Sequence, residues 1–249
     1  MGTHRSRVVP EVRLRPLITT KPQPDRLYGR QRSHPLRARQ LWLMEQVLPL
    51  LRLPEAGSAD PAGAFAHSPQ EVWFEVGFGG GEHARALAEA NPRVGLIACE
   101  VFENGICSML SALVPDDGTE AIPPLPVNLR LWDEDARQLL SKLPDATLSR
   151  LYLMFPDPWP KTRHTKRRFM HPTNIEIAAR VIRPGGIWRI ATDDPTYQDW
   201  TAEVLAGQDA FDVPPPALER PDGWPPTRYE AKALTAGRQP MYWSLTRKA

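Results

Sequence analysis

The sequence predicts an α/β fold built on one mostly parallel, doubly wound sheet. From residue 71 onward, short apolar runs alternate with amphipathic stretches, which is the pattern of repeated strand–helix units. The first apolar run leads directly into the glycine-rich turn 77–81, as happens where a strand passes into a helix beside a ligand. The chain has 249 residues, enough for one such domain with an appended segment.

Two segments precede the first expected strand. Residues 1–35 combine scattered Pro and Arg with no apolar periodicity, so we expect a flexible basic N-terminal arm followed by one folded domain at 36–249. A helix is predicted at 36–51, where apolar residues recur at helical spacing, namely Leu36, Leu43, Val47 and Leu50. The stretch 54–70 is rich in Pro, Gly, Ala and Ser and is expected to be a linker.

The alternating elements then follow in order. Strands are expected at 72–76, 95–100, 127–132, 150–155 and 187–192, and helices at 82–90, 102–113, 136–142, 173–182 and 195–206. The loop 115–126 contains four prolines and is expected at the surface. Residues 241–246 alternate weakly, which predicts an antiparallel strand closing the sheet.

Charge is unevenly distributed behind a formal net charge of +2. Residues 1–40 hold ten Lys or Arg against two acids, and residues 161–168 hold five against none, while the remainder is acidic. Two basic patches on an acidic body favour contact with a polyanion. Cys99 and Cys107 lack metal-ligand spacing and are expected to be reduced core thiols. No run is long enough to span a membrane, so a cytoplasmic protein is expected.

The glycine-rich turn indicates a nucleotide-type cofactor. A dinucleotide fingerprint would need glycine where the chain has Glu82, whose carboxylate would repel a pyrophosphate. S-adenosylmethionine has no phosphate and carries a cationic centre, so it suits this turn better. We expect Gly77 and Gly79 to lie against it and Glu75 to meet its ammonium group.

Two further acids end successive strands. Glu100 lies where a carboxylate accepts hydrogen bonds from both ribose hydroxyls, and Asp135 follows the third strand, within reach of the adenine amino group. The alternatives are a purely structural turn, a helix-capping role for Glu75 and simple surface charges at Glu100 and Asp135.

The segment 155–168, FPDPWPKTRHTKRR, joins a carboxylate to a dense array of cations. Pro156 and Pro158 stiffen the loop around Asp157, and Trp159 offers a face on which a base can stack. The side chains expected to contact RNA are Arg163, His164, Thr165, Lys166, Arg167 and Arg168, with Lys161 just before them. The alternative is a solvated basic turn after a strand.

Five motifs together resemble the bacterial tRNA (guanine-N7)-methyltransferases, which modify guanine 46 in the variable loop. They are EVGFGGGEH, ACEVFENGI, FPDPWPKTRHTKRR, ATDD and TRYEAKALTAGR, spread over about residues 71–238. The resemblance implies a Rossmann-like class I S-adenosylmethionine-dependent methyltransferase domain that acts on tRNA. The basic arm and the loops at 54–70 and 115–126 depart from the family pattern.

The resemblance also implies roles for individual residues. Cofactor-contacting positions correspond to Glu75, Glu100, Asp135 and Asp157, with Asp157 also at the catalytic position. Substrate-binding positions correspond to Lys161, Asp193, Thr227, Arg228, Tyr229 and Glu230, and RNA-contacting positions to 163–168. Guanine N7 has a lone pair and no proton, so its methylation needs alignment and charge stabilisation, with no general base and no metal.

Two other functions stay open. Asp157-Pro158-Trp159 resembles the Asp-Pro-Pro-aromatic motif of adenine-N6 methyltransferases, although the second proline is missing. A non-catalytic RNA-binding protein that has lost cofactor binding is the alternative from another class. The expected partner is tRNA, with no membrane, and the sequence is compatible with a monomer or a homodimer.

Overall fold

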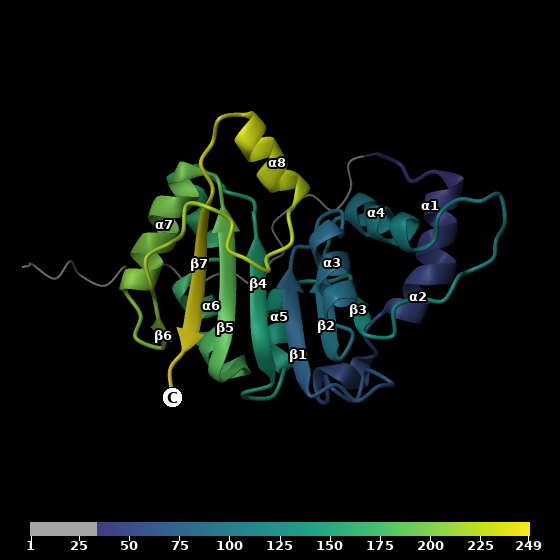
Figure 1. The fold of residues 1–249 in the computed structure, drawn as a ribbon, viewed down its shortest axis with the longest axis horizontal. Helices are drawn as coiled ribbons and strands as arrows, with labels where there is room; N and C mark the ends of the chain where they lie inside the picture. The colour runs from purple at the N-terminus through teal and green to yellow at the C-terminus, as the bar shows by residue number, and fades with distance from the viewer. Residues whose placement is uncertain (1–33) are drawn as a thin grey trace, which may run out of the picture.

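The computed structural model describes residues 34–249, so most of the predicted basic arm lies outside the described residues. One sheet runs through this part of the chain in the order β3-β2-β1-β4-β5-β7-β6 (Figure 1). The strands are β1 Glu71–Val76, β2 Val94–Cys99, β3 Leu129–Trp132, β4 Leu148–Met154, β5 Ile182–Thr192, β6 Phe211–Asp212 and β7 Met241–Arg247. Strands β1 to β5 pair in parallel and β7 pairs antiparallel with β5, which confirms the predicted sheet and its closing strand.

Helices cover the sheet on both faces. They are α1 Ala38–Trp42, α2 Leu48–Leu51, α3 Glu82–Ala90, α4 Glu103–Leu113, α5 Ala136–Lys142, α6 Pro172–Val181, α7 Pro195–Ala206 and α8 Arg228–Thr235. Between α1 and α2 the turn widens into a π-helical segment, η1 Leu43–Val47, and short 3₁₀ turns form at η2 Glu55–Ser58 and η3 Thr162–Arg167. None of the helices that the structure describes is long and apolar enough to cross a bilayer.

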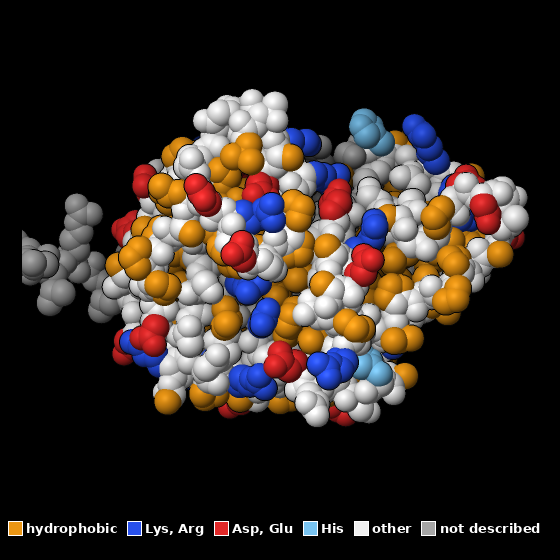
Figure 2. Space-filling model, viewed as in Figure 1, with side chains coloured by type: hydrophobic (Ala, Val, Ile, Leu, Met, Phe, Trp, Pro, Cys, Tyr) orange, Lys and Arg blue, Asp and Glu red, His pale blue; other side chains and the backbone are white. Residues whose placement is uncertain are grey.

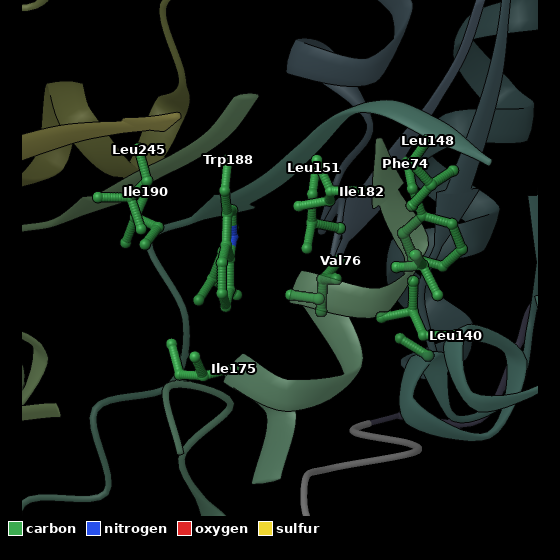
Figure 3. Packing of buried hydrophobic residues seen from close by; sticks show 14 of the residues in the cluster. Phe74, Val76, Leu140, Leu148, Leu151, Ile175, Ile182, Trp188, Ile190 and Leu245 are labelled. Carbon is green, nitrogen blue, oxygen red and sulfur yellow. The ribbon is translucent and has the colours of Figure 1, made fainter. Parts of the chain in front are cut away.

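Each face of the sheet has its own core, because alternate residues of a strand point to opposite sides. On one face, Phe74, Leu151 and Trp188 pack against Leu140 of α5 and Ile175 of α6 (Figure 3). On the other face, the strand side chains pack against α3, α4 and the N-terminal helices. Because β1 to β5 run parallel, their carboxyl ends form one edge of the sheet.

That edge contains a reversal of strand order. Strand β1 lies between β2 and β4, so the connections after β1 and after β3 leave the sheet in opposite directions. In open α/β sheets this reversal leaves a crevice at the carboxyl ends of the strands, and ligands bind there.

The structure differs from the prediction in several elements. Within the predicted helix 36–51 the π segment shifts the apolar face, so that Leu48 and Leu51 are buried while Leu50 is 57% exposed. The predicted linker packs on the domain, because Phe65 is buried against the core. Helix α8 and the short β6 were not predicted.

Candidate active site

A cavity of about 720 Å³ opens at the carboxyl ends of β1, β2 and β4, at the reversal of strand order. Such a volume is typical of sites for cofactors and other small molecules. Its walls come from the strand ends, the glycine turn, the loop after β4 and α8, and they include Val76, Gly77, Gly79, Cys99, Glu100, Asp135, Leu153, Asp157 and Tyr229.

The glycine turn exposes backbone to this cavity. Gly77 has φ of 71° and Gly79 has φ of 59°, values that side-chain-bearing residues rarely adopt. The Gly77 and Phe78 amides donate to the Cys99 carbonyl oxygen, which ties the turn to the end of β2. A Cβ at Gly79 would lie 3.1 Å from the Tyr229 ring, so glycine here lets α8 approach the turn.

The Glu100 carboxylate is held in one orientation by three backbone amides. Gly79 donates to Oε2 at 2.7 Å, and Val101 and Phe102 donate to Oε1 at 2.8 and 2.9 Å. Burial raises the pKa of this carboxyl above its ordinary value, with the nearby Asp157 charge adding to the increase and the three amides opposing it. A fixed, poorly hydrated carboxylate that lines the cavity can accept hydrogen bonds from ribose hydroxyls.

Asp135 also lines the cavity, although its carboxylate already has partners. It caps α5 by accepting from the Arg137 amide at 2.9 Å, and it pairs with the Arg137 guanidinium at 2.5 Å. The sequence placed Asp135 at this edge but gave no sign of the pairing with Arg137, which lines the cavity beside it.

Glu75 does not line the cavity. It is buried at 1% exposure and its carboxylate meets His83 Nδ1 at 3.0 Å. Since Glu75 is absent from the cavity lining, the structure gives it a contact with the start of α3, and direct contact with the cofactor stays a prediction.

The loop after β4 carries Asp157 to the rim of the cavity, where its side chain is exposed. Phe155 and Trp159 have φ of 51° and 43°, so the backbone is left-handed on both sides of Asp157. The Phe155 amide donates to the Ala191 carbonyl oxygen at 2.7 Å, which fixes the start of the loop on β5. These features fix the backbone that carries Asp157.

Arg168 differs from the other predicted RNA-contacting residues because it is buried. It is only 2% exposed, and its guanidinium donates to the carbonyl oxygens of Pro158 at 2.9 Å and Trp159 at 3.1 Å. The same group lies over the rings of Tyr197 and Trp200. Arg168 thus supports the Asp157 loop and also lines the cavity, and its contact with RNA stays a prediction.

The rest of the predicted basic run is accessible. Lys161, Arg163 and Lys166 are exposed, and His164 and Thr165 are half-buried. Arg167 lies over the Trp159 ring at 4.8 Å and lines the cavity. Loss of hydration, followed by the charges of Arg167 and Arg163, lowers the pKa of His164, which favours the neutral ring.

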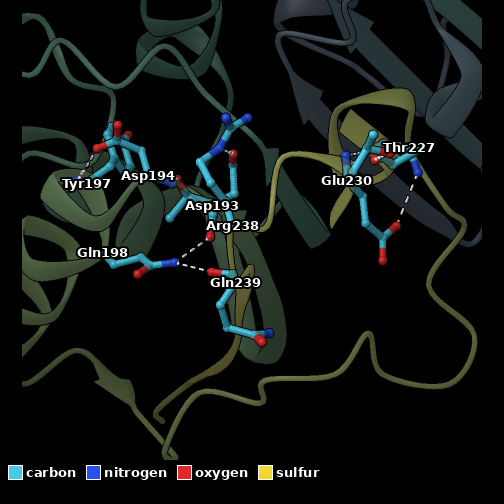
Figure 4. A network of polar contacts seen from close by, with 11 residues as sticks. Asp193, Asp194, Tyr197, Gln198, Thr227, Glu230, Arg238 and Gln239 are labelled. Atoms are coloured by element: carbon cyan, nitrogen blue, oxygen red, sulfur yellow. Dashed lines mark hydrogen bonds and ion pairs between the residues drawn. The ribbon is translucent and has the colours of Figure 1, made fainter. Parts of the chain in front are cut away.

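The predicted substrate segment forms the first turn of α8. Thr227 Oγ1 accepts from the Glu230 amide at 3.0 Å and Glu230 Oε2 accepts from the Thr227 amide at 3.4 Å, a reciprocal cap seen in Figure 4. Glu230 is buried and also bonds Arg220 and Tyr242. Tyr229 alone of this segment lines the cavity.

Two other predicted substrate residues lie away from the cavity lining. Asp193 pairs with the Arg238 guanidinium at 2.5 Å, and Figure 4 shows the two side chains facing each other. Arg228 lies 3.7 Å from the Glu82 carboxylate and donates to the Tyr229 hydroxyl at 3.2 Å. Their substrate contacts stay predictions.

The matches to known proteins agree with this site. Residues 69–242 match a family model described as a putative methyltransferase. The tRNA (guanine-N(7)-)-methyltransferase of Granulibacter bethesdensis is 59% identical over 94% of this chain and 100% of its own length, and that of Rhodospirillum rubrum is 44% identical over 92% and 90%. The chain belongs to the tRNA (guanine-N7)-methyltransferase family. The 16S rRNA methyltransferase KamB, at 16% identity and a TM-score of 0.50 over 73% of this chain and 89% of that one, shares the class I methyltransferase fold.

For this methyltransferase family member, sequence patterns missed the apolar walls of the cavity. Phe102, Phe155 and Phe169 line it from three different connections. Apolar residues in connections look like ordinary core residues, so no local signal identifies them. The first turn of α8 did carry a signal, because Thr227 followed by Glu230 three residues later is the capping-box pattern. In the described part of the chain, no three metal-ligating side chains gather.

Proposed function

We propose that this protein transfers the methyl group of S-adenosylmethionine to N7 of guanine 46 in tRNA, forming 7-methylguanosine. The observation that carries the proposal is the juxtaposition of Glu100 and Asp157 on one cavity: a carboxylate fixed by three backbone amides stands at its wall and an exposed one at its rim. The names of the relatives at 59% and 44% identity supply the substrate class.

The cavity suits a neutral-to-cationic nucleoside cofactor. Glu100, through its two oriented oxygens, would hold the ribose, and the left-handed backbone at Gly77 and Gly79 leaves room beside it. Asp135 would reach the adenine amino group with the lone pairs left by Arg137. When bound, the sulfonium of S-adenosylmethionine supplies an activated methyl group to an incoming lone pair.

The chemistry at guanine asks for alignment and charge compensation. The N7 lone pair forms the new bond to carbon while the carbon–sulfur bond breaks, so positive charge passes from sulfur to the purine ring. Asp157, held between Phe155 and Trp159, can accept hydrogen bonds from N1–H and the N2 amine and stabilise that charge. No proton leaves N7, so no side chain need act as a base.

The exposed basic residues would bind the tRNA backbone. Lys161, Arg163 and Lys166 lie on the segment that follows the Asp157 loop, so phosphates bound there would be close to the target base. The Arg167 guanidinium lies over the Trp159 ring, and the His164 ring packs against it in a T-shaped arrangement. Trp159 would offer a surface on which a base can stack.

Mapping of the product tests the proposal. We expect incubation with bulk tRNA and isotopically labelled S-adenosylmethionine to give label in 7-methylguanosine at position 46, identified by nuclease digestion and mass spectrometry. A tRNA with adenine at 46 is the matched control and should take up no label. Label in N6-methyladenosine, or none in any nucleoside with folded, cofactor-binding protein, would overturn the proposal.

A further inference from the structure

One half of a sheet face is left without a helix in the described structure. Helices α3, α4 and the N-terminal helices pack over β1, β2 and β3. Over β4, β5 and β7 the same face is crossed by the segment 213–227, through Trp224 and a bridge between Ala217 and Tyr242 (Figure 1). Parallel sheets normally have both faces covered, so this opening needs another explanation.

Arginines occupy the open face where a buried sheet would carry apolar residues. Strand register puts Arg150 of β4 beside Trp73 and Ile187, and puts Arg189 of β5 beside Tyr152 and Ser244. Because residues two apart share a face, Arg150 and Arg189 point to the same side. Figure 2 shows Lys and Arg side chains at the surface over β4 and β5, in the middle of this face.

Both guanidiniums rest on aromatic rings. Arg150 lies 4.2 Å above the centre of the Trp73 ring, and Arg189 lies 4.9 Å above that of Trp224. An arginine that stacks on a ring keeps the donors at its edge for another acceptor, and its orientation is fixed before a ligand arrives. This arrangement is common where proteins bind phosphates.

Neither arginine has a carboxylate partner among the described residues. Glu71, which shares this face, pairs with Arg183 at 3.2 Å and accepts from Trp73 and Ser149, and the charge of Arg150 contributes to the lowered pKa of its carboxyl. Arg220, also on this side, pairs with Glu230. Arg189 also contacts the Tyr152 side chain, but its buried Nε has no acceptor among the residues that the structure describes. Half-buried cations without counter-ions are costly, so an external anion would stabilise them.

We propose that Arg150 and Arg189 form a second binding site for the tRNA phosphate backbone, separate from the basic run at 161–167. This inference rests on the proposed function for its choice of polyanion. Arg150 lies in the same strand as Leu153, which lines the cavity, and precedes it by three residues, about 10 Å at roughly 3.3 Å per residue. A tRNA that reaches the cavity with its target base can therefore lay backbone along this face.

The test measures tRNA affinity against salt concentration for Arg150→Gln/Arg189→Gln. Losing two phosphate contacts should reduce the slope of log affinity against log salt by about one to two units. We expect KM for tRNA to rise, with kcat and S-adenosylmethionine affinity unchanged. Lys248→Gln is the control, since it removes an exposed cation that already pairs with Asp212 at 3.8 Å.

Footprinting of the bound tRNA separates this site from the basic run. Phosphates that lose protection in Arg150→Gln/Arg189→Gln should differ from those that lose it in Arg163→Gln/Lys166→Gln. An unchanged salt slope and footprint in a folded double variant would overturn the inference. If the wild-type protein neither binds nor methylates tRNA, the proposed function fails instead. Should the double variant unfold, Arg150→Lys/Arg189→Lys keeps the charge and should show the weaker tRNA binding expected from losing the planar donors.

Discussion

At the scale of single residues, the site depends on how a carboxylate is held. The Glu100 carboxylate accepts hydrogen bonds from three backbone amides, one in the glycine turn and two in the residues that follow Glu100. Its orientation is therefore set before any ligand binds. Burial outweighs these amides and raises its pKa. Ribose hydroxyls that donate to the anion would lower that pKa again, so binding of the cofactor and ionisation of Glu100 are coupled.

This coupling predicts a pH dependence. A group whose pKa falls on binding releases a proton, so affinity for S-adenosylmethionine should decrease as the pH is lowered from 7 through the raised pKa of Glu100. Glu100→Ala should cost about 1.5–3 kcal/mol of binding free energy at pH 7 and remove the dependence. Calorimetry at several pH values measures both, with the exposed Glu89→Gln as control. A flat wild-type profile would remove Glu100 from the site.

At the scale of elements, the loop after β4 is held from both sides. Backbone pairing with β5 fixes its start at Phe155, and the buried Arg168 fixes its centre through the carbonyls of Pro158 and Trp159. Arg168 is the last residue of the basic run in sequence, and it supports this loop. The role of a cation in such a run therefore depends on its burial, which the sequence does not show.

Arg168→Ala should destabilise the fold, whereas Arg163→Ala in the same run should not. Two partly buried carbonyls would lose charged donors, at a cost of about 1–3 kcal/mol of unfolding free energy each. Urea denaturation of Arg168→Ala and of Arg163→Ala measures the difference in their unfolding free energies. Methylation by Arg168→Ala should also slow, because Asp157 loses its fixed position. If both variants were equally stable and lost the same salt dependence of tRNA binding, Arg168 would act as an RNA contact and not as a support of the loop.

At the scale of the whole molecule, the sequence predicted the features of the fold and site that depend on periodic local patterns. The strand–helix alternation, the glycine turn and the acids at strand ends followed from local patterns, and Glu100, Asp135 and Asp157 do line one cavity. Pairings between distant side chains left no such trace. Tertiary packing decides which side chains pair, as Glu75 does with His83 and Asp193 with Arg238. It also decides that Arg150 on the open sheet face stacks on an aromatic ring and pairs with no carboxylate among the described residues.

The most direct test of the account concerns Asp157, at the rim where guanine N7 is proposed to meet the methyl group. Asp157→Asn should leave tRNA and S-adenosylmethionine binding nearly intact and slow single-turnover methyl transfer by roughly 10²–10³-fold, the scale of losing one preorganised electrostatic contact. The wild-type rate should lack a general-base dependence between about pH 6 and 9. A near wild-type single-turnover rate for Asp157→Asn would contradict the assignment.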